Sequence, residues 1–523
     1  MRQEIILWVS IFMLTLVGCF EDEGNYTYAP VEAPVFTFND PEYLTCYGGD
    51  TTFLKGSFYF ERDSAERLKN VRYEWILNDV VLSTERDFNV PTDTVIKKLN
   101  LETGYTDDNG LWGTFNVIEK STGIRYMYAI LFDIRPKFWK GQWLILSENG
   151  DRSKLTYLQL KKKSGKGKID SIYSVIPGVY EQNNGAPIPG KPVRLIDHVA
   201  KNISVSVGAT LILTDQVAYE INNENFVKTT DLKEQFMDGY PGNNPIVDAY
   251  YANNVTFVAT ADGQLYKRAF TANWLGGKFI SDPYSVDSKG YKVTAFGKGL
   301  SANNSNMFPC YDELNRRVLI SNQWDTPFAT FFPVTPRGTN HPLPVWGLPE
   351  GIEYLYLAMV KDISTGSRQG AFCLLFNQDG KTYMSDFLLD TKAPYYYAEC
   401  FESNYTSLKP FPGKPLDKES RILISANTRQ DLIFYTVGNE LRYVNRTNER
   451  DDRVMTFSGK ITMLGMSSYN YNYNELAIGL ENGDFMLVNV ENISKPYIIK
   501  KSVINVGGKV VSASQVGCGY HIE

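Results

Sequence analysis

Histidine and cysteine are scarce in this sequence, and their spacing excludes the common metal sites. Only three histidines, His198, His341 and His521, occur among 523 residues, each far from the others. The six cysteines include no Cys-x-x-Cys pair, and no His-Glu-x-x-His motif occurs. Zinc sites of familiar spacing need such pairs. We therefore expect no metal site and no cofactor, and we expect His341, in a proline-rich segment, to be exposed.

An excess of positive charge is also missing. The chain has 53 lysines and arginines against 59 aspartates and glutamates, a net charge of −6. A nucleic-acid binder needs a concentrated basic face, so no nucleic-acid partner is expected. The strongest basic run, residues 161–168, is interpreted as a solvated hairpin loop, with contact to an anionic partner as the alternative.

Aromatic residues are abundant instead. They make up 14% of the chain, with 34 tyrosines, 29 phenylalanines and 8 tryptophans, alongside 41 glycines and 24 prolines. Aromatic side chains favour strands, and glycine and proline favour turns. The composition therefore predicts an all-β protein.

The N-terminus has the pattern of an export signal. Residues 5–17 form an apolar run that is too short to span a bilayer but has the length of a signal-peptide core. The run ends in Leu16-Val17-Gly18-Cys19, which resembles the lipobox of bacterial lipoprotein precursors. We expect residues 1–18 to be a lipoprotein signal peptide, Cys19 to be lipidated, and residues 19–29 to form an acidic linker.

Residues 30–135 have the pattern of an immunoglobulin-like or PKD-like β-sandwich. Alternating strands are expected at Phe53–Phe60, Arg72–Leu77, Phe115–Glu119 and Tyr126–Ile134, and turn residues separate them. About 100 residues with strands at this spacing is the size of such a sandwich. We expect Trp75, in a central strand, to pack in its core.

Residues 140–523 repeat a strand, a turn rich in Gly, Asp or Asn, and a second strand. One such hairpin every 45 to 65 residues or so is typical of a propeller blade. The repeat predicts a β-propeller of seven blades, give or take one, with Lys509–Val516 as a closing strand paired to the first blade. Two successive sandwiches are the alternative. The predicted hairpins span residues 143–160, 210–221, 255–268, 317–332, 371–387, 432–444 and 475–490.

Aromatic residues grouped in predicted loops are the candidates for ligand binding. Tyrosine and tryptophan offer large amphipathic faces at low entropic cost, which suits peptide or sugar recognition. Ordinary packing between strands is the alternative for these side chains. The candidates are Trp324, Trp346, Tyr395, Tyr396, Tyr397, Tyr469, Tyr471 and Tyr473.

Catalytic motifs are missing. The chain contains no Gly-x-Ser-x-Gly pentapeptide, as an α/β-hydrolase domain would. Residues 185–192 fit Gly-x4-Gly-Lys, but Pro192 replaces the hydroxyl residue that would bind magnesium, and internal prolines remove amide donors. We therefore predict no catalytic residues and no enzymatic activity, with a propeller hydrolase as the less favoured possibility.

Three segments together resemble the PKD-like family of surface lipoproteins in Bacteroidota. They are the lipobox, the acidic stretch Glu21-Asp22-Glu23-Gly24-Asn25-Tyr26, and Tyr73-Glu74-Trp75. The acidic stretch resembles the signal that exports lipoproteins to the outer face of the outer membrane in that phylum.

The resemblance implies a non-catalytic, lipid-anchored protein on the cell exterior. Such a protein would capture oligopeptides or oligosaccharides and associate with a SusC-type TonB-dependent transporter and a SusD-type lipoprotein. The alternative is a structural scaffold subunit of the uptake complex that binds only protein partners.

Replacing Cys19 with alanine should abolish acylation, because the thiol is the group that receives the lipid. Labelling with a fatty-acid analogue, followed by membrane fractionation, measures the effect. The Cys518→Ala variant serves as the control and should remain acylated. Unchanged membrane retention of the Cys19→Ala variant would contradict the lipobox interpretation.

Overall fold

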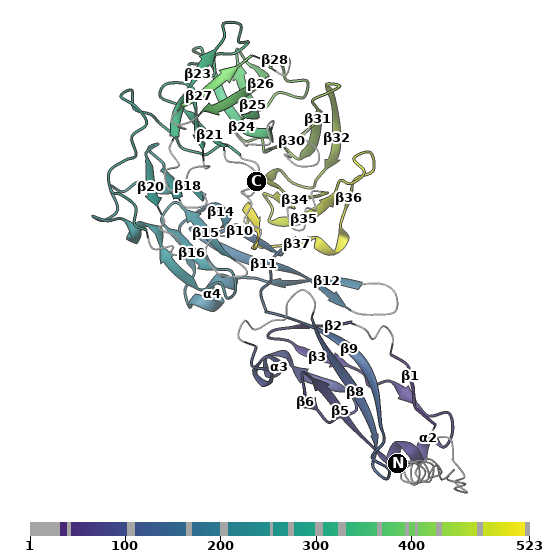
Figure 1. Cartoon of the computed structure of the whole chain (residues 1–523). Coiled ribbons are helices and arrows are strands. Elements are labelled where there is room, and N and C mark those ends of the chain that lie inside the picture. The colour runs from purple at the N-terminus through teal and green to yellow at the C-terminus, as the bar shows by residue number, and fades with distance from the viewer. Residues whose placement is uncertain are drawn as a thin grey trace, which may run out of the picture.

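The computed structural model describes most of the chain, in two β-rich parts (Figure 1). The smaller part is formed by residues up to Arg135, and the larger part by residues from Trp143 to Gly517. The described residues are 32–38, 43–101, 110–163, 170–198, 208–251, 255–269, 277–298, 307–322, 331–362, 369–392, 397–402, 406–424, 431–467 and 474–517.

The N-terminal part is a β-sandwich, as the strand pattern predicts. Its main sheet has the order β2-β9-β8-β5-β6, in which only β2 and β9 run parallel. Trp75 is fully buried on β5, and its ring centroid lies 4.4 Å from that of Phe115. The predicted burial of Trp75 is thus confirmed. The strands are β2 (Tyr43–Tyr47), β5 (Val71–Leu77), β6 (Val80–Ser83), β8 (Leu111–Glu119) and β9 (Arg125–Arg135).

The single strand predicted at Phe53–Phe60 is wrong. The segment divides into β3 (Thr51–Leu54), paired with β7 (Phe88–Pro91), and β4 (Phe58–Tyr59), paired with β1 (Val35–Phe36). Gly56 lies at the break, where a Cβ atom would clash with the carbonyl of Arg86. This close backbone approach makes the chain change partners. Two short helices, α2 (Ser64–Lys69) and α3 (Thr92–Lys98), were also not predicted.

The C-terminal part is a β-propeller, with antiparallel sheets arranged around a common axis (Figure 1). The first sheet is β12-β11-β10-β38, the second is β14 to β17, and the third is β18 to β20. These strands are β10 (Trp143–Asn149), β11 (Arg152–Lys163), β12 (Asp170–Ile176), β14 (Pro192–His198), β15 (Ala209–Thr214), β16 (Ala218–Asn222), β17 (Lys228–Asp231), β18 (Ile246–Tyr251), β19 (Val255–Thr260), β20 (Leu265–Ala269) and β38 (Val510–Gln515).

The remaining sheets follow in chain order around the axis. An eight-stranded sheet contains two antiparallel halves, β21 to β23 and β24 to β28, joined by the parallel pair β23 and β27. Its strands are β21 (Met307–Asp312), β22 (Arg317–Asn322), β23 (Phe331–Arg337), β24 (Glu353–Asp362), β25 (Gln369–Gln378), β26 (Lys381–Lys392), β27 (Tyr397–Phe401) and β28 (Ser407–Pro410). The last two sheets contain β29 (Ile422–Ile424), β30 (Leu432–Val437), β31 (Glu440–Asn445), β32 (Arg450–Thr456), β33 (Ile461–Met466), β34 (Glu475–Leu480), β35 (Asp484–Asn489), β36 (Tyr497–Ile498) and β37 (Ile504–Asn505).

The two ends of the propeller meet in the first sheet. Strand β38, near the C-terminus, pairs antiparallel with β10, so Ile145 lies opposite Ala513. The predicted closing strand at Lys509–Val516 is therefore confirmed. Val510 and Ala513 are fully buried in this pair and in the packing with the last sheet.

All seven predicted hairpins are confirmed as adjacent antiparallel strands. In the fourth unit the predicted hairpin is β22–β23, which lies one strand further out than the predicted hairpins of the other units, because residues 296–298 occupy the innermost position through bridges to Cys310 and Ala358. The hairpin that corresponds by position, β21–β22, was not predicted, because its turn contains no glycine. The Asp312 carboxylate instead accepts hydrogen bonds from the amides of Leu314 and Asn315.

Hydrogen bonds join successive inner strands around the axis, and we call this set the axial girdle. The Leu195 amide donates to Ser512 Oγ at 3.0 Å, the Arg421 Nε donates to the Thr462 carbonyl at 2.8 Å, and Thr462 Oγ1 donates to the Val510 carbonyl at 2.6 Å. The Lys298 amide donates to the Leu357 carbonyl at 2.8 Å.

Asp248 also belongs to the axial girdle. Its Oδ1 accepts Arg194 Nη1 at 2.6 Å, and its Oδ2 accepts the Phe296 amide at 2.9 Å. The carboxylate is 2% exposed, whereas the Arg194 side chain is 19% exposed. One buried carboxylate therefore ties β14 to the two units that follow it.

The segment between the two parts packs against the propeller rather than extending freely. Phe138 and Trp139 precede the predicted start of the propeller at residue 140, and both are buried. The Phe138 ring lies 4.4 Å from that of Phe226, and the Trp139 amide donates to Tyr157 Oη at 2.9 Å. The connecting segment is thus fixed to the first and second sheets.

Replacing Asp248 with alanine should lower the free energy of unfolding by about 3 kcal/mol, because Arg194 loses its charged partner and the buried Phe296 amide loses its acceptor. Urea denaturation followed by tryptophan fluorescence measures the change. Asp238 is exposed, so Asp238→Ala is the control and should change stability by less than about 0.5 kcal/mol. Equal effects of the two substitutions would contradict the role of the girdle.

Candidate functional site

Most of the aromatic candidates lie outside the described residues. These are Trp324, Tyr395, Tyr396, Tyr469, Tyr471 and Tyr473, together with the predicted lipidation site Cys19. Tyr397 is the first residue of β27, and only its backbone is described.

The strands that flank these candidates end at one face of the propeller. The inner strands run in the same direction, because hydrogen bonds join the ends of neighbouring inner strands. The Gln515 side-chain amide donates to Ser467 Oγ, and the Gly517 amide donates to Asp197 Oδ1. Strands β22, β26 and β33 each precede a candidate segment. β33 is an inner strand, and β22 and β26 lie two strands outward from the inner segments of their units. Because direction alternates from strand to strand in these antiparallel sheets, all three strands point the same way. We call this the loop face.

Trp346 is not at the loop face. It lies in the segment between β23 and β24. The carbonyl of the neighbouring Val345 accepts a hydrogen bond from the amide of Val318, near the start of β22, whereas the loop face lies at the other end of that strand. Its ring is half-buried against the core of the eight-stranded sheet and lies edge-on to His341, with centroids 4.9 Å apart. His341 is itself half-buried, so the expectation that it is exposed is wrong.

A buried polar cluster lies where β14 and β18 end. Its members are His198 on β14, Glu220 on β16, Tyr251 on β18 and Arg268 on β20, with Arg268 fully buried. His198 Nε2 donates to Glu220 Oε1 at 2.8 Å, since an ionised carboxylate can only accept. Tyr251 Oη donates to the same oxygen at 3.2 Å, and its ring stacks on His198 with centroids 3.7 Å apart.

Glu220 is held in its ionised form. Burial alone would raise the pKa of its carboxyl, but the hydrogen bond and charge of His198, the charge of Arg268 and the Tyr251 hydroxyl lower that pKa below its ordinary value. Burial raises the pKa of Tyr251 well above 10, so its hydroxyl stays protonated and donates. The cluster joins the second and third sheets.

Further charged groups, centred on Asp197 and Arg317, also serve as cross-links. Asp197 Oδ1 accepts Asn223 Nδ2 at 2.7 Å and the amide of Gly517 at 2.9 Å, which fixes the segment after β38. Arg317, whose side chain is 4% exposed, joins Asp287 and Asp312 at 2.6 and 2.8 Å. These carboxylates stabilise contacts between units and do not line an open cleft.

The described thiols are not activated as nucleophiles. Cys46, Cys310, Cys373 and Cys400 are buried and free. Cys400 Sγ lies 3.7 Å from His341 Nδ1, the geometry of a possible Cys–His pair. Burial, however, raises the pKa of the Cys400 thiol to about 12, so the reactive thiolate is not populated near neutral pH.

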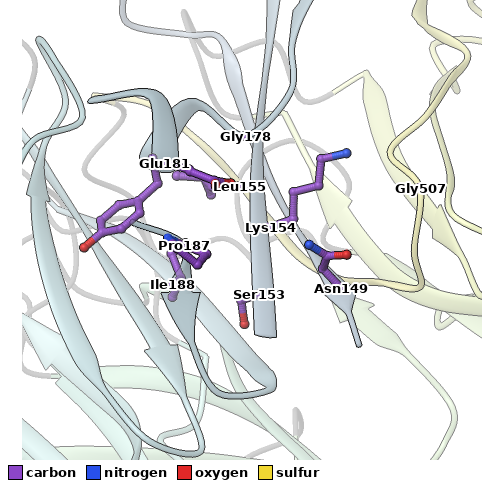
Figure 2. A pocket seen from close by; sticks show the side chains of 10 residues that line it. Asn149, Ser153, Lys154, Leu155, Gly178, Glu181, Pro187, Ile188 and Gly507 are labelled. Atoms are coloured by element: carbon purple, nitrogen blue, oxygen red, sulfur yellow. The ribbon is translucent and has the colours of Figure 1, made fainter. Parts of the chain in front are cut away.

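A pocket of about 140 Å³ opens beside the first sheet, at the end opposite to the loop face (Figure 2). Its walls come from the β10–β11 turn, the segment around α4 (Val179–Asn184) and β13 (Ile188–Pro189), and the segment before β38. The lining residues are Asn149, Ser153, Lys154, Leu155, Gly178, Tyr180, Glu181, Pro187, Ile188 and Gly507.

The pocket combines an apolar floor with charged walls. Leu155 and Ile188 are each 1% exposed, whereas Glu181 and Asn149 are exposed. In Figure 2, Lys154 and Asn149 lie on one side, and Glu181, Pro187 and Ile188 lie on the other. The sequence indicated none of these residues as a site. The segment 185–192 drew attention only as a failed phosphate loop, and its conformation supplies Pro187 and Ile188 instead.

The described ranges contain no group of three or more His, Cys, Asp or Glu side chains arranged to hold a metal ion. None of the helices in those same ranges has the length and apolar character needed to cross a bilayer.

Residues 19–192 match the PKD-like family, a stretch that covers the sandwich and strands β10 to β12 of the first sheet of the propeller. No curated protein sequence is similar to the chain. Among solved structures, a protein from Lactobacillus plantarum is similar over 72% of this chain and 99% of its own, at 10% identity and a TM-score of 0.44.

Two further solved structures are similar at the same level. The periplasmic gluconolactonase of Pseudomonas aeruginosa matches 72% of this chain and 98% of its own, at 9% identity and a TM-score of 0.40. The Dos1 propeller matches 72% of this chain and 88% of its own, at 12% identity and a TM-score of 0.36. Values this low assign no activity to the chain.

Replacing Glu220 with glutamine should lower the free energy of unfolding at pH 7 by roughly 2 kcal/mol. The folded-state pKa of Glu220 lies below its unfolded value, so the ionised group stabilises the fold above that unfolded value. This stabilisation is lost as the pH falls through the folded-state pKa. The two proteins should therefore differ at pH 7 and converge as the pH falls below the folded-state pKa of Glu220.

Urea unfolding at a series of pH values measures this difference. Glu234 is exposed, and Glu234→Gln is the matched control, expected to follow the wild type throughout. A difference between Glu220→Gln and the wild type that does not change with pH would show that the charge of Glu220 is not what stabilises the cluster.

Proposed function

We propose that this protein is a non-catalytic, lipid-anchored binding protein at the outer face of a bacterial outer membrane. It captures oligopeptides or glycans and passes them to a SusC-type TonB-dependent transporter with its SusD-type lipoprotein. The lipobox at Cys19, the acidic stretch that follows it and the match of residues 19–192 to the PKD-like family support this proposal.

The observation that supports a binding role rather than a catalytic one is that the buried ionisable groups serve as structural contacts. Asp248, Glu220, Asp197 and Arg317 each hold neighbouring units together, and each is 4% exposed or less. Groups committed to such contacts are not available to act on a substrate. The charged groups of the pocket in Figure 2, in contrast, face solvent and suit ligand binding.

We further propose that the propeller has seven blades. The eight-stranded sheet contains two antiparallel halves, each with its own innermost segment, at residues 296–298 and at β24. Counting these halves separately from the other five sheets gives seven, which agrees with the seven hairpins in the sequence.

A scaffold that binds only protein partners is the second candidate. The anchoring of Phe138 and Trp139 favours it, because a sandwich fixed rigidly to a propeller can hold two partners at a set distance. Capture and scaffolding differ in whether a small ligand binds.

Native purification from outer membranes, followed by calorimetry, tests the proposal. The full chain in detergent should co-purify with a TonB-dependent transporter and a SusD-type lipoprotein, and it should bind members of an oligopeptide and oligosaccharide panel. Co-purification without binding of any panel member would favour the scaffold. Binding without co-purification would contradict the association with the transporter.

A further inference from the structure

The pocket in Figure 2 carries two oppositely charged side chains that are not neutralised by each other or by neighbours. Among the residues that the structure describes, neither Lys154 nor Glu181 takes part in a salt bridge. The two side chains reach the pocket from different elements, Lys154 from β11 and Glu181 from α4. A ligand that brings both a negative and a positive group would satisfy both.

The Lys154 side chain is held in place rather than swinging in solvent. Its ammonium Nζ donates to the carbonyl of Val506 at 2.9 Å, across the junction between the last sheet and the first. An ammonium has three donors, so two remain for a ligand. Asn149 lies on the same side of the pocket and adds an amide (Figure 2). This wall therefore suits a carboxylate.

The opposite wall suits a cation. Glu181 is exposed on the short helix α4, and an ionised carboxylate can only accept hydrogen bonds. An ammonium group with three donors matches it. Between the charged groups, the floor of Leu155, Pro187 and Ile188 offers an apolar surface.

The pocket lacks an open aromatic platform of the kind on which sugar rings pack. Tyr180 is the aromatic residue in its lining, but that side chain is 5% exposed and its ring stacks on Tyr219. Two opposite charges with an apolar floor between them are complementary to the charged ends and apolar side chain of a short peptide. They match the uncharged hydroxyls of a glycan less well.

We propose that this pocket binds the zwitterionic ends of a dipeptide. The peptide carboxylate lies at Lys154 and Asn149, its ammonium lies at Glu181, and an apolar side chain covers Leu155 and Ile188. The inference rests on the proposed function of ligand capture, and it narrows the ligand class to short peptides and places the site away from the loop face.

Calorimetry on the full chain in detergent tests this assignment with four probes: L-alanyl-L-leucine, its N-acetyl form, its C-terminal amide, and maltose. The free dipeptide should bind most tightly. The Lys154→Met variant should bind it about three- to ten-fold more weakly and bind the amide as the wild type does. The Glu181→Gln variant should show the same loss for the free dipeptide and none for the N-acetyl form.

Lys495→Met and Glu234→Gln are matched controls, because both residues are exposed and neither lines the pocket, and they should change nothing. Unaltered melting temperatures would show that the pocket variants remain folded. Two outcomes would overturn the assignment of the pocket while leaving the proposed ligand capture intact. In the first, dipeptide binding survives both pocket substitutions. In the second, it is lost instead when Tyr469, Tyr471 and Tyr473 are replaced with alanine. Binding of maltose alone would also overturn the assignment and leave ligand capture intact. Failure of every probe and of the wider panel would overturn the proposed capture function itself.

Discussion

The pairing of β38 with β10 is the contact on which the rest of the propeller depends. An open row of sheets would leave the inner edge of the first sheet and one side of the last sheet exposed to water. With β38 in place, the last sheet packs on the first through a continuous core that includes Trp143, Phe485 and Val510. The axial girdle then continues from Thr462 to Val510 and from Ser512 to Leu195, so closure and girdle reinforce each other.

This closure explains where the polar chemistry of the protein is found. The units of a ring must pack face to face, and buried polar groups must have partners there. Asp248, Glu220 and Asp197 therefore each accept two or more hydrogen bonds from adjacent units or from the end of the chain. Lys154 and Glu181, which form no salt bridge with any residue that the structure describes, line the pocket beside the first sheet instead.

The joint between the sandwich and the propeller follows the same principle. Burial of Phe138 against Tyr157 and Phe226 makes the connecting segment part of the core of the first two sheets. The match of residues 19–192 to the PKD-like family extends across this joint.

The sequence determined the features that depend on local periodicity. Alternating strands and glycine-rich or asparagine-rich turns predicted the sandwich, the seven hairpins and the closing strand, and a tryptophan in a central strand predicted a buried Trp75. Where the local signal was missing, an element was missed or misjudged: the glycine-free turn after Asp312 hid the β21–β22 hairpin, and the clash that keeps Gly56 without a side chain divided one strand into two. Only the tertiary structure decided which charges meet. Arg194 and Asp248 are 54 residues apart, Asp197 and Gly517 are 320 apart, and the walls of the pocket come from three separate segments. Ring closure brings these groups together over distances that no local pattern records.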